Sequence, residues 1–226
     1  PAIRSKIDKI LSEMQKEMLS TINQATREAW DLSNKKNDIV TRSILGKIDI
    51  PKDLAAKFFN PNIRALEAFQ RRRDNGLNLA QRIWKNIAPF KHELEAGLAD
   101  GISSGRSAAE MARVMKKYLK EPDKLFRRVR DENGKLQLSK AAQAYNPGQG
   151  VYRSSYKNAL RLTRTETNMS YRNADYERWL SSPFVLGIEI KLSKAHPKYD
   201  ICDPLAGQYP KQFNWAGWHP QCLCFA

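Results

Sequence analysis

Residues 151–192 read VYRSSYKNALRLTRTETNMSYRNADYERWLSSPFVLGIEIKL, and this stretch combines two kinds of secondary structure. Its first part, residues 151–181, repeats large side chains at helical spacing, and Pro183 ends the long helix that this spacing predicts. From Leu186 to Leu192 apolar and polar residues alternate, which predicts a strand with one buried face. We therefore expect a mainly α protein with a small α+β C-terminal part, in which long helices precede a short strand or hairpin and an irregular cap containing Cys and His.

The N-terminal sequence predicts a second long helix. Apolar residues recur mostly every three or four positions, which places them in one stripe on a helix of about thirty residues. The stripe consists of Ile3, Ile7, Ile10, Met14, Met18, Ile22, Ala25 and Trp30. The polar run 33–38 then predicts a loop. The stripe would pack against the following helices or dock onto another subunit.

Shorter helices are expected in the next part of the chain. One starts at Asn60-Pro61, with proline in its first turn, and another covers 79–87 and ends near Pro89. A third covers 94–102, and a capping box of Ser107 and Glu110 opens a fourth that runs to about residue 120. The arginines at 71–73 would lie on a solvated face or contact phosphate.

Residues 122–150 interrupt the helical pattern. A turn at 132–134 predicts a small hairpin, and residues 146–150 predict an exposed loop. The basic side chains of this region are candidate nucleic-acid contacts, namely Lys124, Arg127, Arg128 and Arg130. The predicted organisation is an N-terminal helical region (1–90), a helical middle with this basic hairpin and the long helix (91–182), and a small β-containing Cys/His cap (183–226).

The composition is strongly basic. Among 226 residues, 39 are Lys or Arg and 24 are Asp or Glu, so the formal net charge is +15. We expect salt-sensitive contact with double-stranded DNA of any sequence, although solubility alone would also account for this charge. No apolar run approaches the roughly 18 residues that cross a bilayer, which excludes a membrane-spanning protein. With few cysteines and an N-terminus unlike a signal peptide, the chain is expected to fold in a reducing cytosol.

The last thirty or so residues hold the candidate metal ligands. Zn²⁺ prefers four nitrogen or sulfur ligands, often from two short segments joined by a loop, and such an ion stabilises a small end with little apolar mass. The ligand set we expect is Cys202, His219, Cys222 and Cys224, with His196 as the alternative histidine. The other interpretations are a disulfide, or three free thiols packed as small hydrophobic groups.

Several motifs of the C-terminal half occur in a specific order. Arg164-Thr165-Glu166 and Asn168 lie within the run 152–168 on the long helix, the run 196–203 contains Asp200, and residues 218–224 read WHPQCLC. In this order the motifs resemble those of tailed-phage head morphogenesis proteins, the minor head proteins of the phage Mu F-like family. The likeness covers about residues 91–226 and is looser back to residue 60.

The resemblance implies a minor capsid component present in few copies near the portal. Such a protein acts in head morphogenesis, and in DNA packaging or ejection. The partners implied are the portal and capsid proteins and packaged DNA, with no membrane, and the location is the virion head after assembly in the host cytoplasm. The motif residues implied as structural are Arg164, Thr165, Glu166, Asn168 and Asp200.

The chain departs from the family pattern at two places. Many members have Cys-x-x-Cys where this chain has Tyr199-Asp-Ile-Cys202, and many have arginine where this chain has Leu223. The first departure removes a potential ligand, so zinc would require a histidine.

Arg164 and Glu166 lie two positions apart on the predicted helix and therefore point in different directions. We expect them to tie the helix to the strand and the terminal loop through buried or half-buried charge-assisted hydrogen bonds. The alternative is an enzyme, a nuclease or a nucleotide-transferring toxin, with Glu166 as general base. We expect no enzyme, because no second carboxylate, nucleophile or Gly-rich phosphate loop accompanies the pair.

Overall fold

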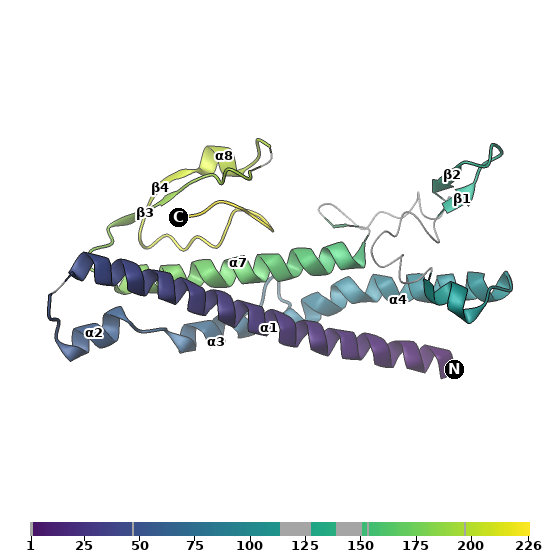
Figure 1. Cartoon of the computed structure of the whole chain (residues 1–226), viewed down its shortest axis with the longest axis horizontal. Helices are drawn as coiled ribbons and strands as arrows, with labels where there is room; N and C mark the ends of the chain where they lie inside the picture. The colour runs from purple at the N-terminus through teal and green to yellow at the C-terminus, as the bar shows by residue number, and fades with distance from the viewer. Residues whose placement is uncertain (1, 47, 114–127, 139–150, 153, 197) are drawn as a thin grey trace. The chain divides into compact units, whose positions relative to one another are not determined.

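The computed structural model describes residues 2–46, 48–113, 128–138, 151–152, 154–196 and 198–226 (Figure 1). The chain forms two compact units that are not continuous in sequence. One comprises Pro1–Met18 and Ala80–Leu160, and the other Leu19–Leu79 and Arg161–Ala226. Every helix in the described part of the chain is too short or too polar to span a bilayer.

The N-terminal helix α1 (Ala2–Leu45) has 44 residues and is longer than the sequence pattern predicts. The loop expected at 33–38 is wrong, because these residues continue the helix. Polar composition favoured a loop, but Ser33, Asn34 and Asn37 are buried and hydrogen-bonded. The apolar stripe that ends at Trp30 is thus followed by a buried polar stripe with the same helical spacing.

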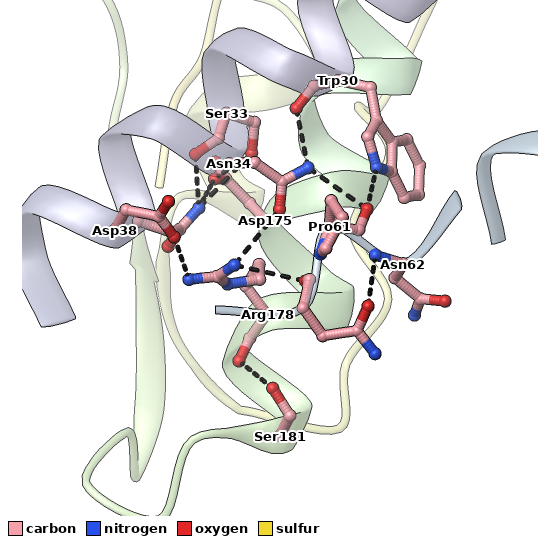
Figure 2. A network of polar contacts seen from close by, with 11 residues as sticks. Trp30, Ser33, Asn34, Asp38, Pro61, Asn62, Asp175, Arg178 and Ser181 are labelled. Carbon is pink, nitrogen blue, oxygen red and sulfur yellow. Dashed lines mark hydrogen bonds and ion pairs between the residues drawn. The ribbon is translucent and has the colours of Figure 1, made fainter. Parts of the chain in front are cut away.

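The polar stripe of α1 packs against the C-terminal part of α7 (Ser155–Ser181), as Figure 2 shows. Asp175, 4% exposed, accepts hydrogen bonds at 2.6 Å from Ser33 Oγ and Asn37 Nδ2, and forms an ion pair at 2.6 Å with Lys36. One turn further along α7, buried Arg178 pairs with Asp38. We call these residues, with Asn34, the polar junction. Each buried charge in it has an oppositely charged partner.

Helix α3 (Ile63–Arg71) packs beside α1 in the same unit. It begins at Ile63, after Asn62 in a left-handed conformation, so the start predicted at residues 60–61 is two residues early. The Trp30 indole donates a hydrogen bond to Pro61 O at 2.7 Å, which places Pro61 before the helix. Trp30, Leu66 and Ala174 form the small apolar core of α1, α3 and α7. The short helix α2 (Lys52–Phe58) buries none of its residues.

In the other unit, the first turns of α1 are joined to α4 (Leu79–Ser103) by polar contacts. Gln15 donates to Ala80 O at 2.8 Å, and Lys91 pairs with Asp8 at 2.5 Å. The helix end predicted near Pro89 is wrong, because Pro89 lies inside α4. Proline removes one helical hydrogen bond, but the apolar face continues past it through buried Ile87 and Phe90.

Of the predicted capping box, the hydrogen bond to the Ser107 side chain is present, and the predicted hairpin is confirmed. Ser107 Oγ accepts a hydrogen bond from Glu110 N at 3.2 Å, as an N-cap residue does, and residues 108–113 are helical. Strands β1 (Arg128–Arg130) and β2 (Leu136–Leu138) form the expected antiparallel hairpin. The rest of the predicted helix to residue 120 and the loop at 146–150 lie outside the described residues.

The closing segment, residues 183–226, contains the expected strand. Strand β3 (Gly187–Ile190) buries alternate residues, Ile188 and Ile190, and pairs with β4 (Gly207–Pro210) in an antiparallel register with Ile188 opposite Tyr209. A short helix, α8 (Cys202–Leu205), lies between the two strands in sequence. The fold is therefore mainly α with a small antiparallel sheet near the C-terminus.

The core of the closing segment is built from sulfur and aromatic side chains. Its buried members are Ile188, Ile190, Cys202, Trp215, Cys222 and Cys224, with Trp179 of α7 packed against them. The rings of Tyr209 and Phe213 stack at 4.5 Å between centroids. The segment thus has a small core of its own, and α7 supplies one wall of it.

Candidate metal centre

Arg172, in the middle of α7, holds the closing segment on the helix. Its guanidinium donates hydrogen bonds to the carbonyls of Ala216 at 3.0 Å, Cys222 at 2.7 Å and Cys224 at 2.8 Å. The group also lies 4.4 Å from the ring centre of Trp215. Burial lowers the pKa of Arg172, while the neighbouring thiols of Cys222 and Cys224 act in the opposite direction.

Gly217 makes the close approach of Arg172 possible. Its φ of +113° is a backbone conformation that residues with a side chain rarely adopt, and a Cβ there would clash with Arg172 Nη1. The backbone conformation therefore favours glycine at this position, and a larger residue would also displace the guanidinium.

The three cysteines converge beside this arginine. All are free thiols and are buried, with Cys202, Cys222 and Cys224 exposed by 3% or less. The sulfur atoms all lie within 4.8 Å of one another, and Cys202 Sγ is 3.8 Å from Cys222 Sγ. The structure therefore forms no disulfide here, and it brings the cysteines into a cluster that could hold a metal ion.

The thiols differ in their electrostatic surroundings. Burial raises the pKa of Cys202 and of Cys224. Burial also raises that of Cys222, but hydrogen bonds with the main chain of Trp218 and Cys224 and the charge of Arg172 outweigh it, so the pKa of Cys222 is lowered. Cys222 is therefore the thiol from which a proton is most easily lost.

The two candidate histidines occupy different places. His219 Nε2 lies 3.1 Å from Cys202 Sγ and 3.3 Å from an Asp200 oxygen, while its Nδ1 is 2.9 Å from Pro220 O. His196 Nε2 lies 3.0 Å from an Asp203 oxygen, and His196, Asp200 and Cys202 form a second group of potential ligands.

The two aspartates shape the loop that carries Cys202. Asp200 accepts a hydrogen bond at 2.7 Å from Cys202 N, and Asp203 accepts one at 2.8 Å from Asp200 N. These backbone hydrogen bonds lower the pKa of each carboxyl group. Asp200 is thus a structural residue of the loop that presents Cys202.

The Arg-Thr-Glu motif lies next to the terminal loop. Thr165 Oγ1 accepts a hydrogen bond from Gln221 N at 3.1 Å, and exposed Arg164 contacts the Gln221 side chain at 3.4 Å. The expected tie between the helix and the terminal loop is present, but Thr165 makes it. Arg164, which we expected to be buried or half-buried, is exposed, and its contact with Gln221 is long.

Glu166 has a different partner from the one predicted. We expected it to reach the strand or the terminal loop, but the ion pair in the structure joins it to Arg72, at the end of α3, at 2.9 Å. Glu166 is 1% exposed, so this is a buried carboxylate. Arg72, which the sequence suggested was solvated or bound to phosphate, also lies 3.8 Å from the ring centre of Phe69.

Asn168 lies on the side of α7 that faces the closing segment. It lines a cavity of about 260 Å³ together with Arg172, Trp179 and Trp215. Aromatic rings, the buried Asp175 and residues 222–226 complete the wall. The cavity therefore adjoins both the cysteine cluster and the polar junction.

The basic residues predicted to contact nucleic acid are described only in part. Lys124 and Arg127 lie outside the described residues, and Arg128 belongs to β1. Arg130 is exposed and donates a hydrogen bond to Gly134 O across the hairpin turn at 2.7 Å.

Sequence reasoning missed the residues that anchor the site to the helices. Arg172, Asp175 and Arg178 recur every three residues on α7, but the predicted helix was described by its large side chains. The available signal was that these three charged residues lie on the same helical face as Thr165 and Ala174. An amphipathic helix normally keeps charges off its buried face, so charges there indicate specific partners.

The chain matches no protein-family model, and no curated protein or solved structure is significantly similar to it.

Proposed function

We propose that the chain is a minor head protein of a tailed phage or prophage, which acts in head morphogenesis near the portal. One observation carries this proposal. The two motifs on which the resemblance depends, Arg-Thr-Glu on α7 and His-Pro-x-Cys-x-Cys at the C-terminal end, contact each other through Thr165 and Gln221 at 3.1 Å. Motifs far apart in sequence are expected to meet when together they define one scaffold.

The proposed role is structural and involves no turnover. Glu166, the carboxylate that an enzyme would use, is buried and paired with Arg72, whereas a general base must reach the proton of a substrate. Cys202 and His219 are close enough for a nucleophilic pair, but burial raises the pKa of the thiol and so opposes its ionisation. Both observations favour a scaffold over a reaction site.

A structural zinc ion on the three cysteines and a histidine is part of the proposal. The closing segment has a small core, and an ion that binds only the folded segment adds its binding free energy to folding. Thiolates and imidazole are ligands that Zn²⁺ accepts.

The proposed partners are the portal protein, the capsid protein and packaged DNA. The formal charge of +15 and the exposed Arg130 support non-specific attraction to double-stranded DNA, with Lys124, Arg127 and Arg128 as further contacts. Binding should weaken steeply as salt rises, and neutralising these residues should reduce the salt dependence.

The deciding experiment deletes the gene from the phage or prophage that encodes it and restores an epitope-tagged copy. We expect the tagged chain in purified particles at low copy number, and the portal protein to co-purify with it from assembling heads. Absence from the particles, together with normal heads in the deletion strain, would contradict the proposal.

Glu166→Gln in the same complementation test separates a scaffold from an enzyme. A scaffold should support head assembly in proportion to the amount of folded protein, as should the exposed control Glu17→Gln. Loss of function by Glu166→Gln with unchanged folding would favour the enzyme instead.

A further inference from the structure

We propose that His219 Nε2 completes the metal site formed by Cys202, Cys222 and Cys224, and that Arg172 is the positioning residue that holds this ligand set on α7. Metal binding and docking of the closing segment onto α7 are then one linked event. This inference rests on the zinc ion of the proposed function and specifies its coordination.

The spacing of the sulfur atoms suits a tetrahedral ion. Two thiolates at about 2.3 Å from tetrahedral Zn²⁺ lie about 3.8 Å apart. Cys202 Sγ and Cys222 Sγ are separated by 3.8 Å, and Cys224 Sγ lies within 4.8 Å of both. The cluster is therefore close to the geometry of a bound ion with little movement of the main chain.

The hydrogen bond of His219 uses Nδ1, so Nε2 is the nitrogen that can bind the ion. Pro220 O can only accept, so His219 Nδ1, 2.9 Å away, donates its N–H to it. Nε2 is the other ring nitrogen; it lies 3.1 Å from Cys202 Sγ and 3.3 Å from an Asp200 oxygen, a contact that it would exchange for the ion. A ligating histidine commonly donates its other N–H to a carbonyl in this way.

Both histidines have a carboxylate near Nε2, and His196 is the weaker candidate because its contact is the shorter one. His196 Nε2 lies 3.0 Å from Asp203, whose carboxylate also accepts the hydrogen bond of Asp200 N, whereas His219 Nε2 lies 3.3 Å from Asp200. Turning His196 towards the sulfurs would break a contact that shapes the Cys202 loop. The contact of His196 with Asp203 instead stabilises the loop that carries Cys202.

Arg172 gives a further indication that negative charge belongs at the sulfurs. Its main-chain contacts are all with neutral carbonyls, and within the described residues it forms no ion pair with a carboxylate. Its guanidinium is partly buried, and the neighbouring groups that can carry a compensating negative charge are the thiols of Cys222 and Cys224. Three thiolates and one histidine around a divalent ion carry a net charge of about −1, which matches the single positive charge of the guanidinium.

The contacts of Arg172 also link occupancy of the metal site to the attachment of the closing segment on α7. The guanidinium binds the carbonyls of Cys222 and Cys224, which are both ends of the Cys-x-Cys segment. Fixing these two carbonyls fixes the directions of the two Cα–Cβ bonds. Occupancy of the site should therefore strengthen the attachment of the closing segment to α7.

The first test measures zinc content and Co²⁺ spectra of the reduced full-length chain. We expect one ion per chain, and Co²⁺ bands typical of three sulfur ligands and one nitrogen. His219→Asn should lower the affinity for zinc by at least about 10-fold and change the Co²⁺ spectrum, whereas the matched variant His196→Asn should change neither.

The second test uses Arg172→Met and Arg172→Lys, with Arg64→Met at an exposed position of α3 as the matched control. Arg172→Met should weaken zinc binding about 10- to 100-fold, as loss of an outer partner does, and Arg172→Lys should recover part of it because the charge remains. If Arg172→Met does not fold, Arg172→Lys and its Co²⁺ spectrum still give the comparison.

Two outcomes would overturn the inference. One is loss of metal in His196→Asn but not in His219→Asn, and the other is unchanged affinity in both Arg172 variants. A wild-type chain without bound zinc would remove the metal site altogether, while incorporation into particles would still decide the head-protein role separately.

Discussion

The polar junction and the closing segment both pack on α7, and both bury charge, but they compensate it differently. Asp175 in the polar junction is surrounded by donors from Ser33, Asn37 and Lys36. Arg178 pairs with Asp38 (Figure 2). In the closing segment, the contacts of partly buried Arg172 are carbonyls and an aromatic ring.

In the polar junction all charges are compensated by other residues of the chain. In the closing segment the charge of Arg172 is better compensated when a metal ion is bound. A buried charge with an internal partner stabilises one packing of two helices and needs nothing further. A partly buried cation beside three thiols is best compensated when the thiols are ionised, which metal coordination brings about. The polar junction should therefore be insensitive to chelators, whereas the closing segment should respond to them.

Asp175→Ala should have the largest effect, because it breaks the polar junction. The change leaves the donors of Ser33, Asn37 and Lys36 without their acceptor, and loss of one member of a buried ion pair costs about 3 kcal/mol or more of unfolding free energy. Denaturant titration measures this loss. Asp31→Ala, an exposed position on α1, is the control, and an equal loss in both variants would contradict the importance of the junction.

Gly217→Ala should break the attachment of the closing segment at a somewhat smaller cost. Both the φ of +113° and the clash with Arg172 Nη1 oppose a side chain, and the backbone strain alone is worth about 1–3 kcal/mol. Thermal unfolding, with and without chelator, measures the effect. Gly105→Ala has a positive φ of +67° but open space around its Cβ, so it should lose less; a larger loss there would show that the contact with Arg172 is unimportant.

Glu166→Gln sharpens the comparison, because it removes a charge but keeps an acceptor. The amide oxygen can still bind Arg72, whose side chain is 22% exposed and can reach water. We expect a loss of about 1 kcal/mol, the difference between a charged and a neutral hydrogen bond. Equilibrium unfolding monitored by circular dichroism is a suitable measurement, and a loss as large as that of Asp175→Ala would be unexpected.

Arg164→Ala should have the smallest effect of the four. Arg164 is exposed, and its contact with Gln221 is long at 3.4 Å. Surface changes of this kind usually stay within about 0.5 kcal/mol. A clear loss of stability would mean that Arg164, rather than Thr165, makes the main tie to the terminal loop.

Local signals in the sequence were sufficient for several elements. The long helix before Pro183, the strand with buried Ile188 and Ile190, and the hairpin around the turn at 132–134 all follow from periodicity and turn residues. The N-cap of Ser107 was predictable for the same reason, since capping involves residues only three positions apart.

Other elements depended on contacts with distant parts of the chain. The polar run 33–38 is helical because its side chains form hydrogen bonds with buried Asp175 of α7. Helix α4 continues through Pro89 because its apolar face is buried both before and after the proline. Arg72 was visible only as one of three arginines, and nothing near it in the sequence indicates Glu166 as its partner.

The sequence by itself determined the types of its main elements and the residues able to bind a metal ion, because periodicity and side-chain chemistry are local properties. Only the tertiary structure decided which of those residues meet. It paired Glu166 with Arg72, joined Asp175 to α1 and placed Arg172 against the main chain of the cysteines. Such pairings depend on how separate helices pack, and a side chain finds its partner in space rather than along the chain.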